Sequence, residues 1–127
     1  MLVTICAIVA LVLLVGLTIF QIALICGAPL GNYAWGGQHK VLPTNFRVSS
    51  LGSVFLYVLF AAVIASKAGL VSGLISEFTV NFSMYVLAAY FTLGIILNGI
   101  SKSKKERTVM TPVVLVLAVC FWVVALT

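Results

Sequence analysis

The sequence predicts an all-α, polytopic membrane protein in which four transmembrane helices form a single bundle. Of the 127 residues, 64% are hydrophobic and only 7% are charged. A soluble domain carries about a quarter charged residues, so this chain has too few to cover a water-facing surface. The apolar residues come in long blocks, without the alternation that marks the strands of a membrane barrel. These observations exclude a soluble globular domain, a disordered chain and a nucleic-acid-binding module.

The four expected spans each have about the 20 residues that a helix needs to cross a ~30 Å hydrocarbon core. They are placed at residues 2–26, 45–68, 77–100 and 104–126, with a loop at 27–44. The first span is expected to be an uncleaved helix, because its apolar run exceeds the ~7–15 residues of a signal peptide. The whole of 1–127 is therefore expected to be one membrane domain.

Capping and turn residues mark the ends of these spans. Pro29 follows the first span, and Thr44 is the expected N-cap of the second. Glu77 gives the third span an acidic first turn. Ser103 and Glu106 match the S-x-x-E capping box, in which each side chain satisfies an amide group at the start of the helix. The third and fourth spans are therefore expected to form a tight hairpin.

Orientation follows from the basic residues in the short loops, since cytoplasmic loops are enriched in Lys and Arg. Two loops on the same side of a four-span chain hold six of the seven basic residues: Lys40, Arg47, Lys102, Lys104, Lys105 and Arg107. The opposite side has only Lys67. The distribution predicts that both loops are cytoplasmic and that both termini lie outside.

The first loop, residues 27–43, has an unusual composition for a linker. It contains four Gly and two Pro, together with Tyr33, Trp35 and the only histidine, His39. Such residues bend the backbone, stack and form hydrogen bonds, whereas a plain linker is rich in Ser or charges. One interpretation is an ordered cap that returns to the membrane face and lines a cavity. The other is an interfacial loop anchored by ordinary aromatic residues.

Polar side chains within the spans gather near the predicted cytoplasmic side. The set comprises Gln21, Ser49, Ser50, Ser53 and Asn98. Groups at similar depth avoid lipid by facing one another. We therefore predict that Gln21, Asn98 and at least one of the serines share a polar pocket that opens to the cytoplasm. In that prediction, Tyr33, Trp35 and His39 fold over the pocket as further ligand-binding residues.

The same polar groups can instead serve as interhelical hydrogen bonds, worth on average about 0.6 kcal/mol each in a membrane. Small residues offer a second packing feature, because Ala61, Ala65, Gly69 and Gly73 recur at every fourth position. Such a face lets another helix approach closely, either within the bundle or in a dimer.

Reactive groups are few. A metal site needs several ligands, and no second His or Cys cluster accompanies His39. The three cysteines form no C-x-x-C pair and are expected to be structural thiols. We expect no catalytic residue, metal or cofactor, and His39 and Glu106 are the only acid–base candidates. No carboxylate lies near the middle of a span, which argues against proton-coupled export.

Two motifs resemble a pattern found in small bacterial four-span integral membrane proteins. The first is G-x-P-x-G-x-x-A-x-G-G-x-H-x-x-L-P at residues 27–43, followed by Arg47 and Ser50. The second is N-x-x-S-x-S-x-x-E-R at residues 98–107, followed by Pro112. The resemblance covers nearly the whole chain. It implies a four-helix fold and the bacterial inner (plasma) membrane, but no activity.

Function is expected to be binding, with a lipid, a small molecule or a partner segment held at the cytoplasmic face. The alternatives are a small transporter or channel subunit and, less favoured, an intramembrane enzyme. A transporter needs polar positions that continue through the bilayer, and the outer half offers little beyond Asn81. The expected partners are the lipid bilayer, a lipid or small-molecule ligand, and a second copy or a larger membrane complex, with no nucleic acid.

Overall fold

A computed structural model describes all residues 1–127 and confirms the all-α fold. The four long helices are α1 (Leu2–Ile25), α2 (Thr44–Lys67), α3 (Glu77–Gly99) and α4 (Lys104–Ala125). Two short 3₁₀ turns, η1 (Gly31–Tyr33) and η2 (Trp35–Gly37), lie in the first loop. Every predicted span boundary agrees with these helices to within one residue.

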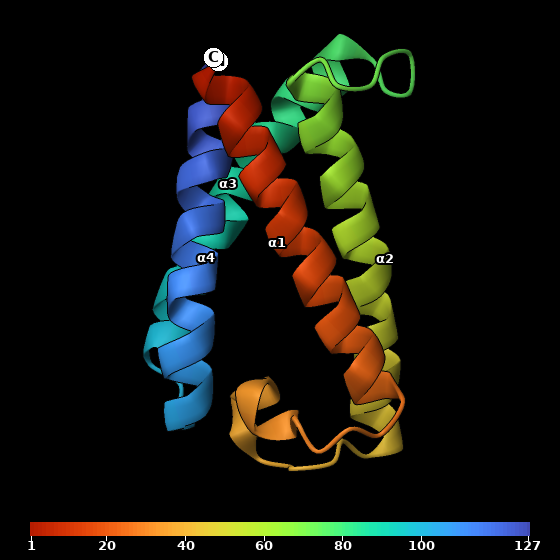
Figure 1. Cartoon of the computed structure of the whole chain (residues 1–127), viewed down its shortest axis with the longest axis vertical. Helices are drawn as coiled ribbons and strands as arrows, with labels where there is room; N and C mark the ends of the chain where they lie inside the picture. Colours follow the sequence, from red (N-terminus) through yellow and green to blue (C-terminus); the bar gives the residue numbers. More distant parts are fainter.

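The helices form two antiparallel hairpins, α1–α2 and α3–α4, that pack against each other. Both termini lie at the same end of the bundle (Figure 1), and the 68–76 connection lies at that end too. We call it the terminal end. The opposite end, which we call the loop end, carries the 26–43 loop and the 100–103 turn.

The outer surface of the bundle is apolar. All four helices are long and hydrophobic enough to cross a membrane. Large apolar side chains point outward from each of them, as with Ile19, Phe55, Phe82 and Leu115. Exposed apolar surface of this extent is stable only against lipid. The chain is therefore a multi-pass membrane protein.

The main apolar core cluster is confined to the terminal half of the bundle, and Leu24 and Leu42 are buried separately near the loop end. Its members are Ala7, Ala10 and Leu14 on α1, Phe60 and Ile64 on α2, residues from Val80 to Phe91 on α3, and residues from Leu117 to Ala125 on α4. Ala7 and Ala10 are completely buried. Their small side chains let α1 approach closely, as small residues do at helix interfaces in membranes.

The loop half is built differently. Figure 1 shows the two hairpins diverging toward the loop end, where η1 and η2 lie across the ends of α1 and α4. Here α1 carries Leu17, Phe20 and Gln21, which are much bulkier than the two alanines about two to four turns earlier. The short 3₁₀ turns contact α4 and fill the space that α1 leaves.

Three local predictions are wrong. Pro43, not Thr44, is the N-cap of α2, and no side chain caps that helix. Helix α2 ends at Lys67, so Gly69 and Gly73 lie in the following turn with positive φ and do not extend the small-residue face. The capping box is only half formed, because Ser103 accepts the Glu106 amide while the Glu106 carboxylate turns elsewhere.

Candidate functional site

The first loop is a folded structure with its own internal contacts. The Gly31 amide donates to the Lys40 carbonyl at 2.8 Å, which closes the loop on itself. Three consecutive residues, Trp35, Gly36 and Gly37, have positive φ values of 52°, 75° and 72°. The two glycines adopt this conformation without strain. Trp35 is the one non-glycine residue of the chain with positive φ, so tertiary contacts must hold it there.

Those contacts join the loop to α2 and α4. Trp35 donates its indole N–H to the Ser50 hydroxyl at 3.2 Å, and its ring packs against Phe46 with centroids 5.7 Å apart. The Gly36 amide donates to the Glu106 carboxylate at 3.1 Å. Ser103 donates its hydroxyl to the Asn32 carbonyl. The loop therefore bridges the starts of two helices that hardly touch each other.

Arg47 fixes the return of the loop into α2. Its Nε donates to the Leu42 carbonyl at 2.8 Å, and its guanidinium lies beside Gly27. Leu42 itself is only 2% exposed. Arg47, expected as a free basic residue of the membrane face, is thus a structural part of the loop. The other basic residues of the loop end are exposed, namely Lys40, Lys102, Lys104, Lys105 and Arg107.

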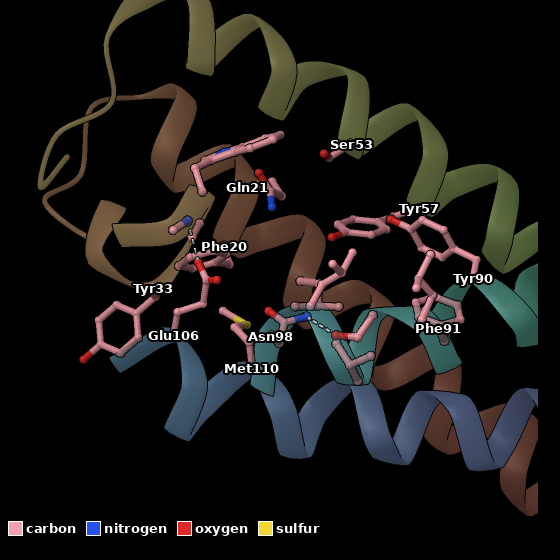
Figure 2. A pocket seen from close by; sticks show the side chains of 18 residues that line it. Phe20, Gln21, Tyr33, Ser53, Tyr57, Tyr90, Phe91, Asn98, Glu106 and Met110 are labelled. Atoms are coloured by element: carbon pink, nitrogen blue, oxygen red, sulfur yellow. Dashed lines mark hydrogen bonds between the residues drawn. The ribbon is translucent and has the colours of Figure 1, made fainter. Parts of the chain in front are cut away.

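A cavity of about 300 Å³ lies beneath the loop, between the two hairpins. All four helices and the loop contribute to its wall (Figure 2). Phe91 belongs both to this wall and to the apolar core, so it forms the inner limit of the cavity. Twelve of the 18 lining residues are hydrophobic, which corrects the prediction of a polar-lined pocket.

Five of the seven predicted ligand-binding residues line this cavity: Gln21, Tyr33, Trp35, Ser53 and Asn98. The other two do not. Ser50 is completely buried and accepts a hydrogen bond from the Trp35 indole, so it lies behind the cavity wall and supports Trp35. His39 is exposed and packs against Phe46, with ring centroids 5.4 Å apart. Ser49 is also exposed and donates its hydroxyl to Asn45 within its own helix.

Gln21 is the most unusual polar residue of the wall. Its side chain is 7% exposed, and its Oε1 atom is buried without a hydrogen-bond partner. Asn98 differs, because its amide Nδ2 donates to the Gly94 carbonyl at 2.8 Å within α3. An unpartnered amide in a low-dielectric environment is unfavourable. The cavity therefore contains a hydrogen-bonding group that the protein itself leaves unsatisfied.

Glu106, which the sequence predicts to be a helix-capping residue and an acid–base candidate, also lines the cavity. It is 8% exposed and points into the cavity, where Gly36 is the only hydrogen-bond donor to its carboxylate. The spacing contained a signal for this, because Glu106, Met110 and Val114 recur every fourth residue and all three line the cavity. His39 lies elsewhere, so the two acid–base candidates do not form a pair.

The remaining charges near the site are arranged around its rim. Lys105 places its ammonium over the Tyr33 ring, 5.8 Å from the centroid. Arg107 donates to the Ser101 carbonyl at 2.8 Å, within the turn that precedes α4. Neither cation forms a hydrogen bond to Glu106.

The loop covers one side of the cavity, and another side of its wall is partly exposed. Three of its lining side chains on α3 are about half exposed, namely Tyr90 at 51%, Leu93 at 54% and Leu97 at 57%. They face α2, which contributes Ser53 and Tyr57 to the wall. Contact between α2 and α3 is the least extensive among the neighbouring helices of the ring. This partly exposed side of the wall therefore faces the lipid between these two helices.

No family model, curated protein or solved structure matches this chain. The fold and the site together define a class: a four-helix membrane protein with a packed core in its terminal half and a cavity in its loop half. No group of three or more His, Cys, Asp or Glu side chains converges anywhere in the chain. The chemistry available in the cavity is therefore that of one carboxylate, two side-chain amides, hydroxyls and aromatic rings.

Proposed function

We propose that this protein is a membrane-embedded binding module whose cavity takes a small amphipathic ligand from the lipid. The supporting observation is the buried Oε1 atom of Gln21, which lacks a hydrogen-bond partner in a mostly apolar wall. Ligand pockets typically combine apolar walls with a few convergent polar groups. A ligand with a polar head and an apolar body satisfies Gln21 and fills the space beneath Trp35.

The route into the cavity follows from its shape. An amphipathic molecule concentrates in the bilayer, and the partly exposed side of the cavity wall there carries Leu93 and Leu97. The loop covers the opposite side, where Trp35 and Gly36 hold it to α2 and α4. The ligand thus enters between helices without displacing the loop.

Binding can be measured through Trp35, which lines the cavity. The chain has two tryptophans, so Trp122→Phe leaves Trp35 as the single reporter. In phosphatidylcholine nanodiscs, we expect para-bromobenzyl alcohol to quench Trp35 fluorescence saturably, because its bromine lies beside the indole when the ring occupies the cavity. Ser53→Phe, which fills the wall from α2, is the variant expected to remove this saturation.

The matched control is Trp35→Phe, in which only Trp122 reports. Trp122 lies on α4 near the terminal end, outside the cavity. Its quenching should rise linearly with the amount of alcohol in the membrane. If Trp35 and Trp122 respond with the same linear dependence, the cavity does not bind the probe and the proposed function is wrong.

Transport is the second candidate, and one observation favours it. A second hollow of about 340 Å³ lies at the terminal end, lined mostly by polar residues and glycines, where Lys67 donates to Asn81 at 2.6 Å. The two hollows could form the ends of a path. The packed core that contains Phe60, Phe91 and Phe121 lies between them, however. A binding module needs no opening of that core, so we favour binding.

We further propose that the loop end faces the cytoplasm of a bacterial cell, as the excess of basic residues there indicates. In a variant whose three cysteines are replaced by alanine, Lys102→Cys and Ser72→Cys place one exposed thiol at each end. An impermeant maleimide applied to intact cells should label position 72 only. Position 102 should react after permeabilisation. Labelling of position 102 in intact cells contradicts this orientation.

A further inference from the structure

The polar groups around the cavity differ in how far the protein itself satisfies their hydrogen bonding. Several N–H and O–H donors are already used within the protein. The Trp35 indole donates to Ser50, the Gly36 amide to Glu106, and the Asn98 amide to Gly94. Ser53 donates its hydroxyl back to Ser49 at 3.4 Å. The Gln21 Nε2 group and the tyrosine hydroxyls of the wall remain as donors, while two acceptors of the wall are left with little or no hydrogen bonding.

These two acceptors belong to Gln21 and Glu106. The first is the Gln21 carbonyl oxygen, which is buried and without a partner on a side chain that is more than nine-tenths buried. The second is the Glu106 carboxylate, which has two oxygens and about four lone-pair sites but receives one amide hydrogen. Figure 2 shows both side chains directed into the same cavity, above Asn98.

The Glu106 carboxylate also has no cation paired with it. Glu106 lies in the first turn of α4, at the positive end of the helix dipole. Buried carboxylates are ordinarily paired with a cation. Lys105, the adjacent cation, instead lies over Tyr33 at the rim. The site thus lacks a counter-charge on the side that faces the cavity.

We propose that the cavity selects a ligand whose polar head is a protonated amine. This inference rests on the proposed function and adds the ligand class to it. An alkylammonium group has three donors and no acceptor, so it satisfies Gln21 and Glu106 together and supplies the missing charge. Aromatic rings around the wall, those of Trp35, Tyr57 and Phe20, also favour a cation and an apolar body.

A matched pair of probes tests the head group alone. Para-bromobenzylamine is protonated at neutral pH and otherwise has the shape of para-bromobenzyl alcohol. In the Trp122→Phe protein, we expect the amine to half-saturate Trp35 quenching at a concentration about tenfold lower than the alcohol, as a charge-assisted hydrogen bond implies. Trp122 quenching in Trp35→Phe corrects both values for the amount of probe in the membrane.

Glu106→Gln tests whether Glu106 is responsible for the preference for the amine over the alcohol. Glutamine keeps an oxygen for the Gly36 amide but removes the charge and adds donors. In this variant the amine and the alcohol should half-saturate Trp35 quenching at about the same concentration, whatever the absolute affinity. The variant is assayed on the same Trp35 signal. If it does not fold, the comparison of the two probes in the Trp122→Phe protein still decides the ligand class.

The outcomes separate the two proposals. Saturable quenching with equal affinities for both probes overturns the amine selectivity and leaves the binding function standing. Saturation with neither probe overturns both. An amine preference that persists in Glu106→Gln overturns the role of this carboxylate. A preference that is lost in Glu106→Gln supports the inference.

Discussion

Replacing Gly37 by alanine is expected to destabilise the protein by roughly 2–4 kcal/mol, because backbone strain and a steric clash act together. Gly37 has a φ of 72°, a conformation that residues with a side chain adopt only at a cost. A Cβ atom at this position would overlap the Ser103 side chain, which itself caps α4 and holds Asn32. The substitution therefore pushes the loop away from α4.

The neighbouring glycine provides the control. Gly36 has almost the same φ, 75°, but a Cβ atom there would meet no atom within 4 Å. Gly36→Ala is expected to lose only about 1–2 kcal/mol, the strain contribution alone. Reversible unfolding in mixed detergent micelles, followed by far-ultraviolet circular dichroism, gives both values. Equal losses in the two variants would show that the loop does not press against Ser103.

Gln21→Met is expected to have the opposite effect, raising the free energy of unfolding of the empty protein by about 1 kcal/mol. Methionine has nearly the same length and removes a buried carbonyl that has no partner. The same change should abolish the saturable quenching of Trp35, since it removes the polar group that receives the ligand. Stability and binding therefore move in opposite directions in one variant.

Thr111→Val is the control that separates the effect on stability from the effect on ligand binding. The Thr111 hydroxyl is also buried without a partner, but Thr111 does not line the cavity. Valine has the same shape, so unfolding should again become less favourable while Trp35 quenching is unchanged. If Gln21→Met stabilises the protein and leaves the quenching intact, Gln21 has no part in binding.

The fold could be predicted from the sequence because membrane helices must satisfy all their backbone hydrogen bonds internally. Long apolar blocks and the turns between them were enough to place each helix to within one residue. The prediction that polar side chains at similar depth share one pocket succeeded for the same reason. Gln21, Ser53 and Asn98 come from three helices, and their distance from the loop end already brought them to one level of the bundle.

The predictions that failed concern the direction in which a side chain points, not its depth along the bundle. Glu106 was placed at the correct level, but its carboxylate has two candidate amides within reach, those of Ser103 and Gly36, and binds the second. The Ser103 amide donates to Ser101 instead. His39 was expected to cover the cavity because it lies in the loop, yet the left-handed turn at residues 35–37 directs the chain so that it meets Phe46. Such outcomes require the three-dimensional path of the loop.

The confinement of the core to the terminal half makes local stability differ along each helix. Amides near Ala10, Met84 and Phe121 are enclosed by that core and should exchange with deuterium only when the whole protein unfolds. Amides near Gln21 and Asn98 border the cavity and should exchange through smaller local openings. One end of every helix thus maintains the fold, while the other can change shape around the molecule that it holds.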